Sequence, residues 1–470
     1  MSLSSYSYGD IVIAPYQFES ILEFILTKEL NDHAKLYIRG IVPEEKMDQY
    51  VEGADGDEWL EVTLKEGEGT RSLFQGVVTN MTVQTTRNAR IMAIEAYSST
   101  FFMDIHKRSR SFQNASMAYQ ELFAQITGEY ADSDVVDQAT QGATTGGLLV
   151  QYKETDWTFL KRLASHFHAQ LAPICGLKGT KFYVGVQDFP ARHKLEEFNY
   201  AIKKDLKGYR ILAANDLPNL DEQDLISYEI TSTRLLELGS TVEFKDRKLY
   251  VFRAETAMVD GELIHTYILR EKSGLSCRKS YNPSLVGASL FGKILDVSKD
   301  KVKVKLDIDK GQGTGGSLWF AYSTIYSSPD GSGWYCMPEV GDHIRLYFPD
   351  EQERHAFAAS SVDTTSSDTS KRSDPSVKSI STKYGKQIVF QPGSVEIMGS
   401  GKLLMRLTDD GGIEINSDKK IILSAEGDIE MNGGAKILIQ GDEGIDFKQA
   451  NATISIVDDV TISGGKVNMK

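Results

Sequence analysis

Long apolar runs are missing from this sequence of 470 residues. No stretch of 18 apolar residues occurs, and the longest uncharged run, residues 311–329, is rich in Gly, Ser and Tyr, which excludes a hydrophobic membrane-spanning helix. The chain opens without a basic segment followed by an apolar one, so we expect no secretion signal and synthesis in the cytoplasm.

Basic residues are outnumbered by acidic ones. The sequence has 52 Lys and Arg against 66 Asp and Glu, which gives a formal net charge of −14. Phosphate binding needs clustered positive charge, so we expect no nucleic-acid partner. An acidic surface also keeps a large particle from associating with itself or with anionic membranes.

Cysteine and the common catalytic motifs are scarce as well. Cys175, Cys277 and Cys336 are odd in number and far apart, which indicates reduced thiols. Gly-x-Ser-x-Gly, Cys-x-x-Cys and His-Glu-x-x-His are absent. His166 and His168 would point about 200° apart on the helix expected there, which disfavours a shared metal ion. We therefore assign no catalytic, cofactor or metal residue and expect a protein that is not an enzyme.

An eight-residue repeat fills the C-terminal part of the sequence. Each octad carries two apolar residues two positions apart, which places both side chains on one face of a strand, and the remaining positions are turn formers. A short fixed period of this kind is typical of repeat architectures. The two rows, which we predict to form the core of a needle, are Met405, Ile413, Ile421, Ile429, Ile437 and Ile445, and Leu407, Ile415, Leu423, Met431, Ile439 and Phe447.

The length of the octad leaves two architectures open. Eight residues span roughly 26 Å, enough for one strand and a corner but too little for a full turn of a single-chain solenoid. The strands could reverse at each turn into an antiparallel meander, or three identical chains could each supply one wall of an intertwined β-prism. The pattern slips by one position near Asn451 and continues at Ile454, Ile456 and Ile462.

Two amphipathic helices stand out in an otherwise strand-rich sequence. Residues 114–130 carry Ala118, Leu122 and Ile126 four apart, and the helix is expected to stop at Gly128. The second helix is predicted behind a Thr155 cap and is expected to end before Pro173.

Strand patterns and composition divide the chain into six parts. Alternating apolar residues predict a small antiparallel barrel or sandwich first, with residues 19–30 as a strand or short helix. Five probable strands between 286 and 362, residues 333–340 among them, suit a Greek-key barrel of OB type. The expected parts are 1–100, a first β-barrel; 101–219, an α/β insert; 220–285, a second β-barrel; 286–362, an OB-fold domain; 363–385, a Ser/Thr/Asp linker; and 386–470, the octad repeat.

Three segments resemble one family in order along the chain. "RSRSFQNASMAYQELFAQI" (108–126) resembles the R-x-F-Q-N-x-S segment of VgrG proteins and phage tail hub proteins. "ETDWTFLKRLASHFHAQL" (154–171) is similar to their E-S-D-W-x-F-L-x-R-L helix, and "GWYCMPEVGDHIRLYFPDEQERHAFAASSV" (333–362) to the closing strands of their OB domain. With the octads, these segments cover nearly the whole chain.

The resemblance implies a fold and a function. The fold is mainly β: two hub barrels with an α/β insert, an OB-fold barrel and a trimeric intertwined β-helix needle, which selects the prism. The function is that of a homotrimeric hub and spike at the tip of a contractile injection machine, whether phage tail, tailocin or type VI-like. A tail-associated cell-wall or glycan hydrolase on a rigid β-stalk is the alternative, and a receptor-binding fibre is a weaker one.

The resemblance also implies partners. Tube and baseplate proteins would bind the hub end, and a small PAAR-like protein would cap the needle at Val467, Asn468, Met469 and Lys470. An effector could travel as cargo, and the target-cell envelope would be met during firing. No His follows His355, so the His-x-His iron site of some spikes is not matched, and neither a muramidase insertion nor a fused toxin is expected.

Overall fold

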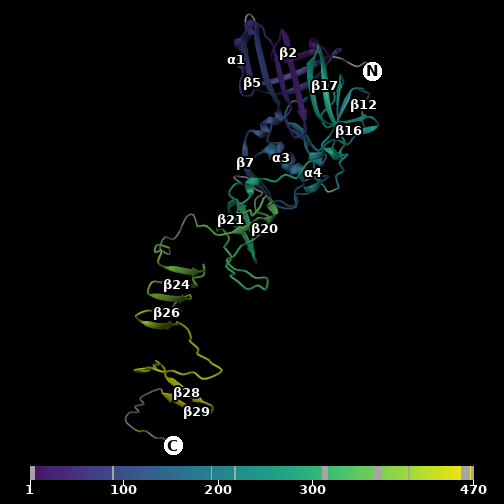
Figure 1. Ribbon diagram of the computed structural model, residues 1–470. Helices are drawn as coiled ribbons and strands as arrows, with labels where there is room; N and C mark the ends of the chain where they lie inside the picture. The colour runs from purple at the N-terminus through teal and green to yellow at the C-terminus, as the bar shows by residue number, and fades with distance from the viewer. Residues whose placement is uncertain are drawn as a thin grey trace. The chain divides into compact units, whose positions relative to one another are not determined.

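The computed structural model of the chain describes residues 6–86, 89–191, 193–215, 217, 219–309, 316–363, 372–400, 403–456 and 466. The chain divides into two compact units, Met1–Thr364 and Thr365–Lys470 (Figure 1). Among the described residues, no helix combines the length and the apolar character needed to cross a bilayer.

A 12-stranded sheet forms the framework of the first unit, and it is largely antiparallel. Its main path runs β1-β4-β5-β6-β3-β2-β16-β17-β14-β13, and β15 with β12 branches from β16. Residues 19–30, predicted as a strand or a short helix, are a strand. The members are β1 (Ile11–Ala14), β2 (Ser20–Glu29), β3 (Lys35–Ile41), β4 (Trp59–Glu66), β5 (Gly69–Thr86), β6 (Ala89–Ser98), β12 (His193–Leu195), β13 (Tyr200–Lys204), β14 (Ile226–Ser232), β15 (Thr241–Phe244), β16 (Arg247–Val259) and β17 (Glu262–Arg270).

Alternation of apolar residues builds two cores on this sheet. Phe24 and Leu26 on β2 and Leu36 and Ile38 on β3 are fully buried at every second position, because successive strand side chains point to opposite faces. A second core lies around the strands of residues 226–270. Pairing of β2 with β16 joins the strands of the two predicted hub parts into one sheet. Two short helices accompany the sheet: α1 (Met47–Gly53) and α4 (Leu206–Asn215).

The insert packs two helices over short strands, as expected for an α/β part. α2 ends before Gly128, and Thr155 caps α3 by accepting a hydrogen bond from the Thr158 N–H at 3.2 Å, so both predicted helix signals are confirmed. The insert has its own core around the buried Trp157. Its elements are β7 (Lys107–Phe112), α2 (Tyr119–Thr127), β8 (Asp134–Asp137), β9 (Leu149–Thr155), α3 (Asp156–Ser165), β10 (Leu171–Pro173) and β11 (Lys181–Val184).

Helix α3 is shorter than the sequence predicted. It ends at Ser165, and His168 adopts a positive φ of 56°. Leu171, expected on the helix, lies instead in β10, where it pairs with Val184 of β11. The ring of His166 lies 3.0 Å from the Ser280 carbonyl oxygen, and that of His168 lies 3.0 Å from the carbonyl of Cys277, so both histidines hold a neighbouring segment.

The OB domain has five strands, but one of the five predicted strands is wrong. Residues 333–340 form no strand; Gly333 has a φ of +140° and Pro338 lacks an N–H, which interrupts strand pairing. The fifth strand is β22, which pairs with β21. The sheet has the order β20-β19-β18-β21-β22, with β18 (Ser289–Ser298), β19 (Lys301–Leu306), β20 (Trp319–Ala321), β21 (His343–Tyr347) and β22 (Phe357–Ala359).

The second unit contains an antiparallel meander and a hairpin; Figure 1 labels β24 and β26 of the meander and both strands of the hairpin. Residues 417–444 have no regular strand. The meander starts inside the predicted linker, with β23 (Lys378–Ser381), β24 (Gln387–Gln391), β25 (Ser394–Met398), β26 (Leu404–Thr408) and β27 (Gly412–Asn416); the hairpin is β28 (Ile445–Gln449) with β29 (Ala452–Ile456).

Candidate functional sites: a buried polar joint and an apolar sheet face

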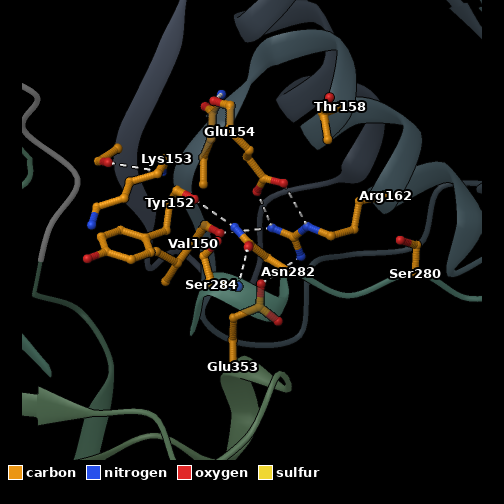
Figure 2. Close-up of polar contacts among 12 residues, drawn as sticks. Val150, Tyr152, Lys153, Glu154, Thr158, Arg162, Ser280, Asn282, Ser284 and Glu353 are labelled. Atoms are coloured by element: carbon orange, nitrogen blue, oxygen red, sulfur yellow. Dashed lines mark hydrogen bonds and ion pairs between the residues drawn. The ribbon is translucent and has the colours of Figure 1, made fainter. Parts of the chain in front are cut away.

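Arg162 of α3 lies at the centre of a buried ion-pair group between the insert and the OB domain (Figure 2). Its Nη2 contacts Glu154 Oε1 at 2.7 Å and its Nη1 contacts Glu353 Oε1 at 2.8 Å. The carbonyl of Val150 accepts a further hydrogen bond from Nη2 at 2.8 Å. The guanidinium is only 2% exposed, so its partners replace almost all of its lost hydration. Because Glu353 belongs to a 3-10 turn of the OB domain, the group fixes that domain to helix α3.

The charges of this group depend on one another. Burial lowers the pKa of Arg162, but Glu353 and Glu154 outweigh it and the net pKa shift is upward. Burial raises the pKa of Glu154 and outweighs the opposing effect of Arg162, and the neighbouring carboxylate of Glu353 adds a smaller upward effect. Arg162 therefore stays cationic, and each carboxylate depends on it.

A second set of buried contacts joins β7 of the insert to the OB domain. The backbone N–H and the Oγ of Ser111 both donate to the carboxylate of Asp309, each at 2.6 Å. Gln113 Nε2 donates to the Val304 carbonyl at 3.1 Å, and its Oε1 accepts from the Gly316 N–H at 3.0 Å. We call these contacts, together with Arg162, Glu154 and Glu353, the polar joint.

A third cluster binds the two family-like segments of the insert to each other. Arg110 Nη2 contacts Asp156 Oδ1 at 2.8 Å, and its Nε donates to Gln151 Oε1 at 2.7 Å. Tyr130 donates to the other oxygen of Asp156 at 2.5 Å. Asp156 is fully buried at the first position of α3, where the helix dipole favours a negative charge. The helix that carries Arg162 is thus held firmly at its start.

The meander presents two continuous apolar ladders on one face. Because the strands reverse, Met405 of one sequence row pairs with Ile415 of the other, and Leu407 pairs with Ile413. The i, i+2 pairs therefore share one face, as the spacing predicted. The full ladders are Ile380–Ile388–Ile397–Met405–Ile415 and Phe390–Val395–Leu407–Ile413.

The opposite face of the meander is polar. Arg406 on β26 contacts Glu396 at 2.8 Å and Glu414 at 3.4 Å across the two neighbouring strands. On the apolar face, by contrast, four residues of the predicted needle core are 36–70% exposed: Met405, Leu407, Ile413 and Ile415. The first ladder lines an open groove of about 540 Å³. Among the described residues, the sheet therefore has one face of paired polar side chains and one apolar face without a covering layer.

Of the remaining predicted needle residues, only Ile445 and Phe447 lie in paired strands of the single chain. Ile445 pairs with Ile456 and Phe447 with Ile454 in the terminal hairpin, again on a common face. The predicted core residues of 417–444 are all more than half exposed: Ile421, Leu423, Ile429, Met431, Ile437 and Ile439. Ile462 and the predicted docking residues Val467, Asn468, Met469 and Lys470 lie outside the described residues.

Within the part of the chain that the structure describes, no three His, Cys, Asp or Glu side chains gather in a way that could hold a metal ion. Cys175 is buried, Cys277 half-buried and Cys336 exposed, and none of the three forms a disulfide within the part of the chain that the structure describes. The ionisable groups that do cluster, around Arg162 and Asp156, are buried and paired, so their geometry serves cohesion between elements.

No residue of the polar joint was assigned a role from the sequence. Arg162 had a local signal, since it is a charged residue among the apolar residues Phe159, Leu160 and Leu163 of the helix. Glu353 and Asp309 had none, because each meets its partner far away in the sequence.

A strand-rich sheet with a helical insert, an OB domain and a terminal repeat follow one another along the chain. The family model of the phage tail baseplate hub (GPD) matches residues 57–166. The fold of the chain is also similar to that of a chain in a PdpA–VgrG complex, and the resemblance to the family of VgrG and phage tail hub proteins is confirmed.

Two solved structures illustrate the likeness. The first is the Escherichia coli c3393 protein, described as a component of the type VI secretion system with structural similarity to T4 bacteriophage tail proteins gp27 and gp5. It is 14% identical with a TM-score of 0.54, over 75% of this chain and 99% of that one. A chain of the Francisella PdpA–VgrG complex is 9% identical with a TM-score of 0.55, over 84% of this chain and 76% of that one. None of the curated proteins compared with the chain matches it.

Proposed function

We propose that this chain is the hub and spike at the tip of a contractile injection machine and that it acts as a homotrimer. The uncovered apolar face of the second unit is the observation that carries the proposal. Monomeric proteins rarely leave apolar patches larger than a few hundred Å² in water, and here two ladders of large side chains run across five and four strands. Two further copies of the same face would bury them.

Three meanders can serve as the three walls of one prism. Each wall would turn its Met405–Ile415 ladder inward and its Arg406 ion pairs outward, which matches the chemistry of the two faces. The antiparallel meander would then be the form of the single chain, and the prism would be the assembly of three such meanders. Residues 417–444, which have no strand in the single chain, would find their partners in the neighbouring copies.

The work of such a trimer is mechanical. A sheath would drive a tube that ends in this protein, and the needle would concentrate the force on a small area of the target envelope. The polar joint supports this role, because contacts such as Arg162 with Glu353 and Ser111 with Asp309 resist rotation of the OB domain against the insert. Many backbone hydrogen bonds between stacked strands would act together in the shaft.

The partners follow from this place in the machine. Tube and baseplate proteins would bind the hub, a PAAR-like protein would cap the tip near Val467–Lys470, and the protein would leave the cell as part of the particle. The VgrG of Francisella is described in a complex with PdpA, which supports a protein cargo or companion for this chain too.

Electron microscopy of particles from the native operon tests the proposal. Gold labels against the hub should mark one end of each tube, and a version lacking residues 386–470 should give particles without a spike. Labels that never associate with tubular particles would contradict it. A positive zymogram from the pure protein would instead favour the hydrolase.

A further inference from the structure

The five strands of the OB domain carry a basic surface, which the proposed function does not use. Side chains alternate along these strands, so that one face forms the apolar core of the domain and the other is exposed or half-buried. We call the second face the basic face, because it holds all the Lys and Arg of the five strands against one acidic residue, Asp296. Its charge is opposite in sign to the net charge of the chain, which is −14. The cations are Lys293, Lys301, Lys303, Lys305 and Arg345.

A row of basic side chains crosses three neighbouring strands in the middle of this face. Lys293 of β18 lies directly opposite Lys305 of β19 on one side and opposite His343 of β21 on the other. Side chains in such positions have their Cβ atoms about 5 Å apart, and like charges at that spacing destabilise a sheet. Among the described residues, neither Lys293 nor Lys305 forms an ion pair. The row therefore lacks the negative charge that would stabilise it.

The acidic residues close to the row in the sequence are placed elsewhere. Asp300, Asp307 and Asp342 lie in turns between the strands. Asp309 is buried, and both of its carboxylate oxygens accept hydrogen bonds from Ser111. An anion from outside the chain is thus the natural partner of the row.

An aromatic ring lies beyond the row on each side. Trp319 of β20 is opposite Lys303, whose Nζ lies 4.6 Å from the centre of the indole ring. Phe291 is opposite Arg345, whose guanidinium carbon lies 5.2 Å from the centre of the phenyl ring. Asp296 pairs with Lys303 at 3.6 Å and so leaves the row itself unpaired. Both rings keep about 40% of their surface exposed, Trp319 39% and Phe291 40%.

The kind of cation indicates which anion fits. Lys carries a compact point charge that suits phosphate, whereas Arg presents a planar fork that recognises carboxylates through two hydrogen bonds. The basic face has four Lys, and its single Arg345 packs against Phe291. Phosphate groups therefore fit the row better than the carboxylates of an acidic protein segment.

The two rings indicate what carries the phosphates. Trp319 and Phe291 each pack against a cation, so neither projects from the surface as a membrane anchor does. A long nucleic acid would be repelled by the acidic remainder of the chain. A short sugar chain meets both conditions, because the C–H groups of a sugar ring can pack on an aromatic ring while its phosphates reach the lysines.

We propose that the basic face binds a phosphorylated sugar chain, with phosphates on Lys293 and Lys305 and a sugar ring on Trp319. The source of this sugar, the envelope of the target cell, rests on the proposed function. The OB domain precedes the needle in the chain, so it would follow the needle to the envelope. Binding there would hold the particle in place while it fires.

Phosphomannan, a mannose polymer that carries phosphate groups, tests the proposal with the full-length protein. The wild type should bind immobilised phosphomannan at least about tenfold more tightly than the same polymer after phosphatase treatment. Lys293→Gln/Lys305→Gln should weaken this binding by at least about tenfold, because it removes two charges from the phosphate contacts. Lys203→Gln/Lys207→Gln removes two exposed charges outside the OB domain and should leave the binding unchanged.

Two further readouts separate binding from folding. Because the row places like charges opposite each other, Lys293→Gln/Lys305→Gln should not lower the midpoint of thermal unfolding. Phosphomannan should change the tryptophan emission of the wild type, and Trp319→Phe should lack most of this change although the other three of the four tryptophans remain.

The outcomes separate this inference from the proposed function. Equal binding of the two polymers, or full binding by Lys293→Gln/Lys305→Gln, overturns the sugar site alone. Oligothymidylate, polyglutamate or phosphatidylethanolamine–phosphatidylglycerol vesicles that bind through Lys293 and Lys305 more tightly than phosphomannan assign the basic face to nucleic acid, protein or membrane, and they overturn it as well. Hub labels that never associate with tubular particles overturn the proposed function, whereas phosphate-dependent binding by the pure protein would still support the site.

Discussion

Arg162 and Glu353 are 191 positions apart in the sequence, yet their side chains form a buried ion pair of 2.8 Å. One lies in a helix of the insert and the other in a turn of the OB domain. Two packed bodies can slide on apolar contacts, whereas a buried guanidinium with three fixed acceptors permits one geometry only. This ion pair therefore fixes the orientation of the OB domain relative to helix α3 of the insert.

Arg162→Met should destabilise the first unit by about 3–5 kcal/mol, because it leaves Glu154 and Glu353 buried without a counter-charge. The measurement is the midpoint of guanidinium unfolding of the full-length chain, followed by a hub-specific signal such as tryptophan fluorescence. A loss below about 1 kcal/mol would contradict the role of Arg162.

Two matched variants sharpen this test. Lys194→Met breaks an ion pair with Glu243 in which both side chains are exposed, and it should leave the unfolding midpoint nearly unchanged. Arg162→Met combined with Glu154→Gln and Glu353→Gln removes the uncompensated charges, and it should recover part of the lost stability.

His265 should make the hub sensitive to acid. The ring is fully buried, its Nδ1 lies 2.7 Å from Thr256 Oγ1, and its Nε2 has no hydrogen-bond partner among the described residues. Burial first, and then Lys28 and Arg71, lower the pKa of His265 from 6.5 to about 4.

The direction in which stability changes with pH follows from proton binding. Below pH 6.5 the unfolded chain binds a proton at His265 that the folded chain refuses, so stability falls as the pH falls from 6.5 to about 4. The slope is about 1.4 kcal/mol per pH unit, roughly 3 kcal/mol in total. His265→Gln should remove this component, which is measured as the difference in unfolding free energy between variant and wild type at neutral pH and near pH 5. An unchanged pH dependence in the variant would refute the assignment.

Ile421→Asp should be severe and Glu426→Asp nearly silent. Both positions are exposed in the single chain, so a monomer would tolerate both changes. In the proposed trimer, Ile421→Asp places three carboxylates together on an apolar axis, at a cost of several kcal/mol each. Thermal dissociation of the trimer, followed by light scattering, distinguishes the two variants; equal melting of both would exclude the inward assignment of Ile421.

Removal of residues 463–470 should abolish binding of a cap protein. The proposed cap protein docks near Val467–Lys470, so this truncation removes its expected binding site. The measurement is co-purification of a small protein from the native operon with wild-type and truncated chains. Equal retention by both would show that the cap, if any, binds elsewhere.

Local signals were enough to predict several elements. The Thr155 cap and the stop at Gly128 depend on side-chain and backbone chemistry within one turn, and both helices begin or end there. The spacing of Met405 and Leu407 likewise predicted a shared face, because strand alternation is a local property.

Tertiary contacts decided what the sequence could not predict. Helix α3 stops early because Leu171 gains strand pairing with Val184, a partner that no helical pattern reveals. Residues 333–340 were predicted as a strand, but Gly333, with its positive φ, and Pro338, which lacks an N–H, interrupt strand pairing there. The roles of Glu353 and Asp309 depend on distant partners, and in the proposed trimer the layer that covers the apolar ladders would belong to other copies of the chain.

The molar mass of the full-length protein in solution tests the central claim most directly. Light scattering on a sizing column at micromolar concentration should give about 157 kDa, three times the chain mass of 52.2 kDa. Deletion of residues 386–470 should weaken or abolish this association, because it removes the uncovered ladders. A full-length protein that elutes at 52.2 kDa under these conditions would contradict the trimeric spike.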